Sequence, residues 1–230
     1  MHSSLKSIPG IFLDFFLPRF CPGCNKKLIP DEKSVCENCL SSILTADKER
    51  LKNEYDRNFS SEKVIKDFYS KYVFETDKTL QHIIHALKYQ NKFKLGIFLG
   101  EIISEGINKL DWKIDLIIPV PIHHLKKAER GYNQSDYIAK GISNKLNIPY
   151  STKLIKRIRH TESQTKLNMN DRAKNVAKAF KVRDEKKIIA KNILLVDDII
   201  TTGATIQECG RVLIDAGASS VFACSIGIAK

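Results

Sequence analysis

Apolar residues occur as short continuous runs that alternate with stretches of helical periodicity between residue 79 and the end of the chain. Two runs, 115–121 (DLIIPVP) and 193–196 (ILLV), are typical of parallel strands covered on both faces, and 219–228 predicts a final strand. Helical spacing marks the segments 79–89, about 95–110, about 131–146 and 205–216. This alternation predicts an α/β fold with a mostly parallel sheet flanked by helices.

The run at 193–196 leads directly into two acids and a turn of small residues. Asp197 and Asp198 stand at the carboxyl end of the predicted strand, where open α/β sheets bind ligands, and carboxylates there suit ribose hydroxyls or a magnesium-bound sugar phosphate. The turn offers three hydroxyls and backbone N–H groups at a helix N-terminus, which suits a phosphate. Its residues are Thr201, Thr202, Gly203, Ala204 and Thr205. The missing GK[ST] pattern excludes a Walker loop.

A second candidate ligand segment ends the strand at 115–121. Proline fixes its own φ and favours an extended preceding residue, so Val120 and Pro121 should belong to a stiff loop. Three cations, Lys126, Lys127 and Arg130, follow this loop. A stiff loop with cations downstream suits a pyrophosphate, and an ordinary strand-to-helix connection has the same pattern.

Four cysteines near the N-terminus form two CxxC pairs. They are Cys21, Cys24, Cys36 and Cys39. Two such pairs complete the tetrahedral thiolate shell that zinc prefers. Since every position is a cysteine, no site remains open for a reactive water, so we expect structural zinc. The loop at 25–35 has few apolar residues, and the metal should supply its folding free energy.

The chain of 230 residues is long enough for one main domain and a small module. We expect an N-terminal helix and zinc module at 1–45, a linker or connecting helix at 46–78, and the main domain at 79–230. No apolar run reaches the roughly 20 residues that cross a bilayer. Thiols in metal-type spacing favour the reducing cytosol.

The net charge of +12 is concentrated in one segment. Residues 151–191 hold 13 Lys and Arg against 4 Asp and Glu. A local positive field of this kind favours polyanionic ligands, either phosphorylated substrates or nucleic acid, and a lysine-rich solvated surface has the same composition.

Adjacent acids followed by the turn at 201–205 resemble the motif of type I phosphoribosyltransferases that binds phosphoribosyl pyrophosphate (PRPP). That resemblance implies that Asp197 and Asp198 are the catalytic acids, holding the ribose hydroxyls, and that the turn holds the 5′-phosphate, with magnesium accompanying PRPP. Together with PVP, RGYNQ and the paired CxxC knuckles, the motifs resemble the ComF family. They imply a flexible hood loop over the phosphates that includes Arg157, Arg159, Gln164 and Arg172.

The resemblance implies a cytoplasmic PRPP-binding factor that handles incoming single-stranded DNA in natural transformation, with a competence helicase as partner. Two other functions stay open: a phosphoribosyltransferase that acts on an unidentified nucleobase or other nucleophile, and a PRPP sensor without catalysis. Purine phosphoribosyltransferases begin the phosphate turn with an aspartate that serves as general base, whereas this chain has Thr201. A hydroxyl cannot take that proton at neutral pH, which disfavours purine salvage by that mechanism.

Overall fold

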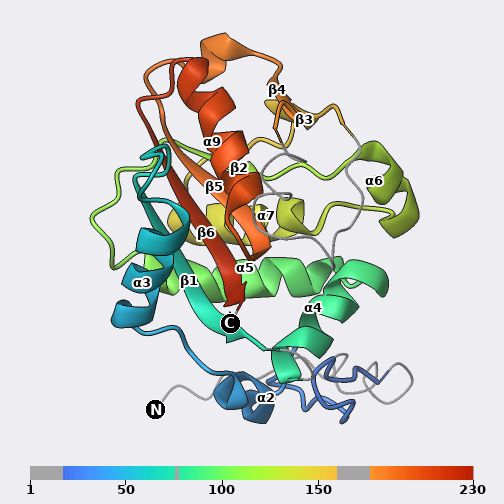
Figure 1. The fold of residues 1–230 in the computed structure, drawn as a ribbon. Helices are drawn as coiled ribbons and strands as arrows, with labels where there is room; N and C mark the ends of the chain where they lie inside the picture. The colour runs from blue at the N-terminus through green and yellow to red at the C-terminus, as the bar shows by residue number, and fades with distance from the viewer. Residues whose placement is uncertain (1–17, 76–77, 160–176, 230) are drawn as a thin grey trace.

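The computed structural model describes residues 18–75, 78–159 and 177–229. Its main sheet has four parallel strands in the order β1-β6-β5-β2 (Figure 1). They are β1 (Asp67–Phe74), β2 (Leu116–Pro119), β5 (Asn192–Ile200) and β6 (Ser220–Ala229). A separate antiparallel pair consists of β3 (Ile155–Arg157) and β4 (Phe180–Val182). The predicted α/β fold with a mostly parallel sheet is confirmed.

Helices cover both faces of the main sheet (Figure 1). One face carries α4 (Thr79–Tyr89), α5 (Phe93–Ile107) and α7 (Gln134–Leu146), and the other carries α3 (Lys48–Asn58) and α9 (Ala204–Asp215). Three shorter elements are α2 (Glu37–Ser42), α6 (His124–Arg130) and the 3-10 helix η1 (Glu185–Lys187). Among the helices of the described segments, none has the length and apolar character that a membrane span requires.

Strand β5 divides the core into two layers. Because successive side chains of a strand point to opposite faces, Leu194 and Val196 pack toward α4, α5 and α7. Ile193 and Leu195 pack toward α9. The same alternation continues into the acidic residues that follow.

The segment 46–78, expected to be a linker or connecting helix, contains two ordered elements. Asp47 begins α3 by accepting a hydrogen bond from the backbone N–H of Arg50. Strand β1, which the sequence analysis did not predict, then pairs with β6 over most of its length. Of the segment 8–20, interpreted from the sequence as an N-terminal helix, residues 8–17 lie outside the described residues.

Short backbone segments cover both edges of the main sheet. Beside β1, Ala46 N donates to Lys71 O at 2.9 Å and Val73 N donates to Leu44 O at 2.8 Å. Beside β2, Ile117 N donates to Pro149 O at 2.9 Å, and Ser151 N donates to Ile117 O at 3.0 Å. These contacts satisfy backbone groups that an edge strand would otherwise leave unpaired.

The cysteine-bearing segment packs below α4, next to α2 (Figure 1). Its buried side chains, including Leu28, Val35 and Ile43, belong to the same apolar cluster as Leu80 of α4. Lys33 also forms an ion pair with Glu101 of α5 at 3.3 Å. The module therefore uses the helices of the main domain to complete its small core.

Candidate functional site

The two acids lie inside β5, which continues to Ile200 instead of ending at residue 196. Strand alternation sends their carboxylates to opposite faces of the sheet. Asp198 is buried on the side of α4 and α7, where its Oδ2 accepts from Lys88 Nζ at 2.8 Å and from Gln134 Nε2 at 3.1 Å. Asp197 is half-buried on the side of α9, and its Oδ1 accepts from Ser135 Oγ at 3.1 Å.

Burial, and after it the neighbouring Asp198 carboxylate, raises the pKa of Asp197 to about 7. The backbone N–H of Asp198, the charge of Lys88 and the hydroxyl of Ser135 oppose this shift. Within the described residues, Asp197 Oδ2 has no hydrogen-bond donor. This oxygen can therefore accept a hydrogen bond from a hydroxyl group of a ligand, or bind a hydrated cation that accompanies the ligand.

The phosphate turn lies at the N-terminus of α9, on the side of the sheet that Asp197 faces. Gly203 caps the helix with a left-handed φ of 69°. A Cβ on Gly203 would come within 2.7 Å of the Phe59 ring, so glycine is also required for close packing. The first backbone N–H groups of α9 lack intrahelical acceptors and are suited to bind an anion. Thr201 is exposed, and Thr202, Ala204 and Thr205 are half-buried.

The loop after β2 is held rigidly against the same edge of the sheet. Val120 N donates to Val196 O of β5 at 2.9 Å, and Asn133 Nδ2 donates to Val120 O at 3.0 Å. Pro121 continues this loop and is half-buried. Arg130 ends α6 and lies over the Tyr89 ring at 5.2 Å. The loop and Arg130 therefore lie beside the acids.

Further cations converge on this edge of the sheet. Arg157 of β3 lies over the Phe180 ring at 5.3 Å, and burial lowers its pKa while the nearby Asp197 carboxylate opposes this shift. Burial also lowers the pKa of Lys126, and the positive charges of Arg157, Arg130 and Lys88 lower it further. The positive charges of Arg157, Arg130 and Lys88 are therefore near enough to Lys126 to act on its pKa.

The residues expected to form a hood loop have different positions. Arg157 lies near enough to Asp197 for that carboxylate to act on its pKa, whereas Arg159 Nη1 donates to Ala177 O at 2.8 Å beside the β3–β4 pair. Gln164 and Arg172 lie outside the described residues.

Sequence reasoning missed the role of Lys88 and the contacts of Gln134 and Ser135 with the acids. Gln134 and Ser135 belong to the GYNQS sequence, which indicated a helix start and a family motif but no contact with the acids. Lys88 follows the apolar face of a predicted helix without any local motif. Its partner is far away in the sequence, so only the fold reveals the contact.

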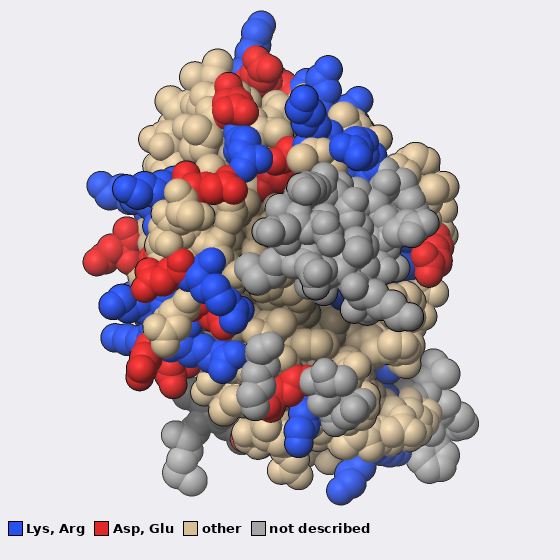
Figure 2. Space-filling view, viewed as in Figure 1, with Lys and Arg blue, Asp and Glu red and all other residues tan. Residues whose placement is uncertain are grey.

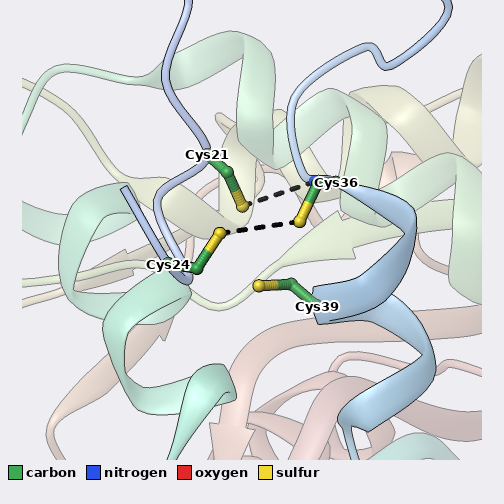
Figure 3. A group of neighbouring side chains, drawn as sticks. All are labelled: Cys21, Cys24, Cys36 and Cys39. Carbon is green, nitrogen blue, oxygen red and sulfur yellow. Dashed lines mark hydrogen bonds between the residues drawn. The ribbon is translucent and has the colours of Figure 1, made fainter. Parts of the chain in front are cut away.

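The four cysteines form a compact cluster in which the sulfur atoms face one another (Figure 3). Their ligand atoms all lie within 4.8 Å of one another, and the sulfurs of Cys24 and Cys36 are 3.7 Å apart. Tetrahedral zinc–thiolate bonds of 2.3 Å would separate the sulfurs by about 3.8 Å. A Cβ on Gly23 would lie 2.8 Å from Cys39 Sγ, so the knuckle needs a glycine there. The cluster can hold a metal ion.

Comparisons with known proteins agree with the fold. The family model "Phosphoribosyl transferase domain" matches residues 133–229. "Competence protein F" of Haemophilus influenzae is 33% identical over 148 residues, or 62% of this chain and 65% of that protein. "DNA utilization protein YhgH" of Escherichia coli K12 is 28% identical, over 62% and 64% respectively.

The chain thus spans somewhat less than two thirds of these two relatives. "Competence protein ComFC" of Streptococcus pneumoniae is 26% identical over 209 residues, or 87% of this chain and 84% of that protein, and this match extends over most of both chains. The matched domain and these relatives together show that the chain contains a phosphoribosyl transferase domain and is similar, over most of its length, to the competence protein ComFC.

Proposed function

We propose that this chain is a ComFC-like competence protein, a cytoplasmic PRPP-binding factor that handles incoming single-stranded DNA during natural transformation. The observation that carries the proposal is the meeting of Asp197, the N-terminus of α9 and several cations at one edge of the sheet. The names of the relatives, which refer to competence and to DNA utilization, support the biological role.

The site offers one group for each part of PRPP. The carboxylates at 197 and 198 suit the ribose hydroxyls, and the turn at 201–205 suits the 5′-phosphate. Val120, Pro121 and Arg130 suit the pyrophosphate, whose charge the nearby cations would neutralise. Magnesium would enter with the pyrophosphate and further offset its charge.

The cysteine cluster supports structural zinc. Its spacing fits tetrahedral thiolate coordination, and the four cysteines leave no position for a catalytic water. Zinc would join the first knuckle to the start of α2, because Cys36 caps this helix and Cys39 lies within it.

The basic surface supports contact with nucleic acid. Within 151–159 and 177–191 the chain has 10 Lys and Arg against 2 Asp and Glu. Blue side chains gather around β3 and β4, with some acidic ones at the same end of the molecule, and those over α3 are closely mixed with acidic residues (Figure 2). A competence helicase would be the expected protein partner for a factor that receives single strands.

A phosphoribosyltransferase activity is the second candidate, and the convergence of Lys126, Arg130 and Arg157 favours it. In that reaction a nucleophile attacks C1 of PRPP, the C1–O bond breaks, and pyrophosphate leaves with the electron pair. Cations at this edge would stabilise the leaving group. The exposed Thr201 cannot accept the proton of the nucleophile at neutral pH, so the nucleophile must lose its proton to another group or to water.

Thermal unfolding with PRPP and magnesium tests the proposed site. A ligand that binds only the native state raises the melting temperature, and the double variant Asp197→Ala, Asp198→Ala should lose this shift. A wild-type protein without a shift at millimolar PRPP, or a double variant with a wild-type shift, would contradict the proposal. Pyrophosphate release with a panel of bases then separates the enzyme from the binding factor.

A further inference from the structure

The two acids of β5 differ in what they contact. Both oxygens of Asp198 are already occupied by protein donors: Oδ2 accepts from Lys88 and Gln134, and Oδ1 accepts from the backbone N–H of Ile199 at 2.7 Å. Asp197 keeps Oδ2 without a donor among the described residues and faces the side of the phosphate turn. The family motif gives both acids one role, whereas these contacts separate them.

Lys88 has the geometry of an anion-binding residue. Its Nζ lies 2.8 Å from Asp198 Oδ2, and its side chain is 23% exposed, so a ligand can reach it. An ammonium group has three N–H donors, and Asp198 is the one acceptor that the structure gives it among the described residues. Two donors therefore remain for a ligand.

Gln134 connects Asp198, the partner of Lys88, to Arg130, the cation that follows the loop after β2. Its Nε2 donates to Asp198, and its Oε1 accepts from Arg130 Nη1 at 3.2 Å. Tyr89, the residue after Lys88, accepts from Arg130 Nη2 at 3.3 Å. The ends of α4 and α6 are thus held side by side, so that Lys88 and Arg130 lie close together.

We propose that Lys88 binds the pyrophosphate group of the ligand and that Asp198 is its positioning residue, leaving Asp197 as the acid that holds the ribose. This inference rests on the proposed PRPP site and refines it. A buried ion pair contributes little net stability, because the cost of desolvation offsets the attraction between the charges. Stability alone therefore does not account for a partly exposed lysine with two remaining donors at this position, whereas a bound anion does.

Comparing PRPP with ribose 5-phosphate, which lacks the pyrophosphate, tests the inference. Lys88→Met should weaken PRPP binding about tenfold or more, since a charge-assisted hydrogen bond is lost, and should leave ribose 5-phosphate binding unchanged. Asp198→Asn should act in the same direction, because Lys88 then lacks its anchor. Asp197→Asn should weaken both ligands. Lys94→Met, on the exposed side of α5, is the matched control and should change neither.

Lys88→Met leaves Asp198 buried without its counter-charge, which can impair folding. The double variant Lys88→Met, Asp198→Asn removes both charges and should recover stability while still failing to distinguish PRPP from ribose 5-phosphate. A wild-type ratio of the two affinities in either variant would overturn the inference and leave the PRPP site intact. If the wild-type protein binds neither compound, the proposed function fails, and the inference fails with it.

Discussion

The carboxyl group of Asp197 is suited to bind a ligand, but its ionisation lowers the free energy of unfolding. Its folded-state pKa is about 7, whereas an aspartate in an unfolded chain has a pKa of about 3.9. Between these values the folded protein holds a proton that the unfolded chain has released. The contribution of this group to the free energy of unfolding is therefore most favourable below about pH 4, and it is lost as the pH rises to about 7.

Asp197→Asn should remove this pH dependence. We expect the substitution to raise the melting temperature by a few degrees at pH 8, and to change it little at pH 4, where the native carboxyl is already protonated. Scanning calorimetry at the two pH values measures the difference. Asp111→Asn, in an exposed loop, is the control that should show no such difference. A larger gain at pH 4 than at pH 8 would contradict the sign of the shift.

Gly203 combines a left-handed backbone with close packing, and alanine substitution should therefore have two costs. The backbone term alone is about 1–2 kcal/mol, and contact of the new Cβ with the Phe59 ring adds to it. Gly131 also has a positive φ, of 78°, but the nearest atom to its Cβ position is 3.6 Å away. Urea denaturation should therefore show a greater loss for Gly203→Ala than for Gly131→Ala. Equal losses would mean that Phe59 moves away without cost.

At the scale of elements, sequence periodicity predicted the helix at 79–89 and the strands β2, β5 and β6, because their apolar residues face a core on one or both sides. It missed β1, whose sequence DFYSKYVF mixes charged, polar and aromatic residues within a polar segment. The burial of β1 depends on pairing with β6 across the fold. The contact between Lys88 and Asp198 depends on the same tertiary placement, so no local pattern could indicate it.

Removal of the metal should disorder one part of the protein first. The cysteine module has a small core shared with α4, whereas β5 and β6 lie in the centre of the sheet. Chelation should therefore increase amide hydrogen exchange in residues 18–43 and at the start of α4, with little change in β5. Zinc analysis of the purified protein gives the stoichiometry, expected to be one per chain. Exchange that rises equally in β5 and in the module would contradict this local role.

At the scale of the whole molecule, the uneven charge predicts electrostatic binding of single-stranded DNA. Each phosphate contact should contribute about −0.7 to the slope of log K against log salt. Lys153 and Lys181 lie exposed on the basic side, whereas Arg157 and Arg159 have partners within the protein. The double variant Lys153→Ala, Lys181→Ala should therefore flatten the slope by about 1.4. Fluorescence anisotropy with a short oligonucleotide measures the slope.

The control for this measurement is Lys48→Ala, Lys52→Ala on α3, where basic and acidic side chains are interspersed (Figure 2). This variant has the same loss of charge and should keep the wild-type slope. If both double variants flatten the slope equally, binding follows net charge and not the surface beside β3 and β4.

The covering of β1 by residues 44–46 has a further consequence for solubility. This short segment follows the cysteine module directly, so its place on the sheet depends on the module. If the module unfolds, the N–H and C=O groups of β1 become available to a strand of another molecule. Loss of metal should then appear as intermolecular β-sheet and turbidity that increase with protein concentration, although the centre of the sheet is still folded. The metal would thus keep the protein soluble by holding a sheet edge closed.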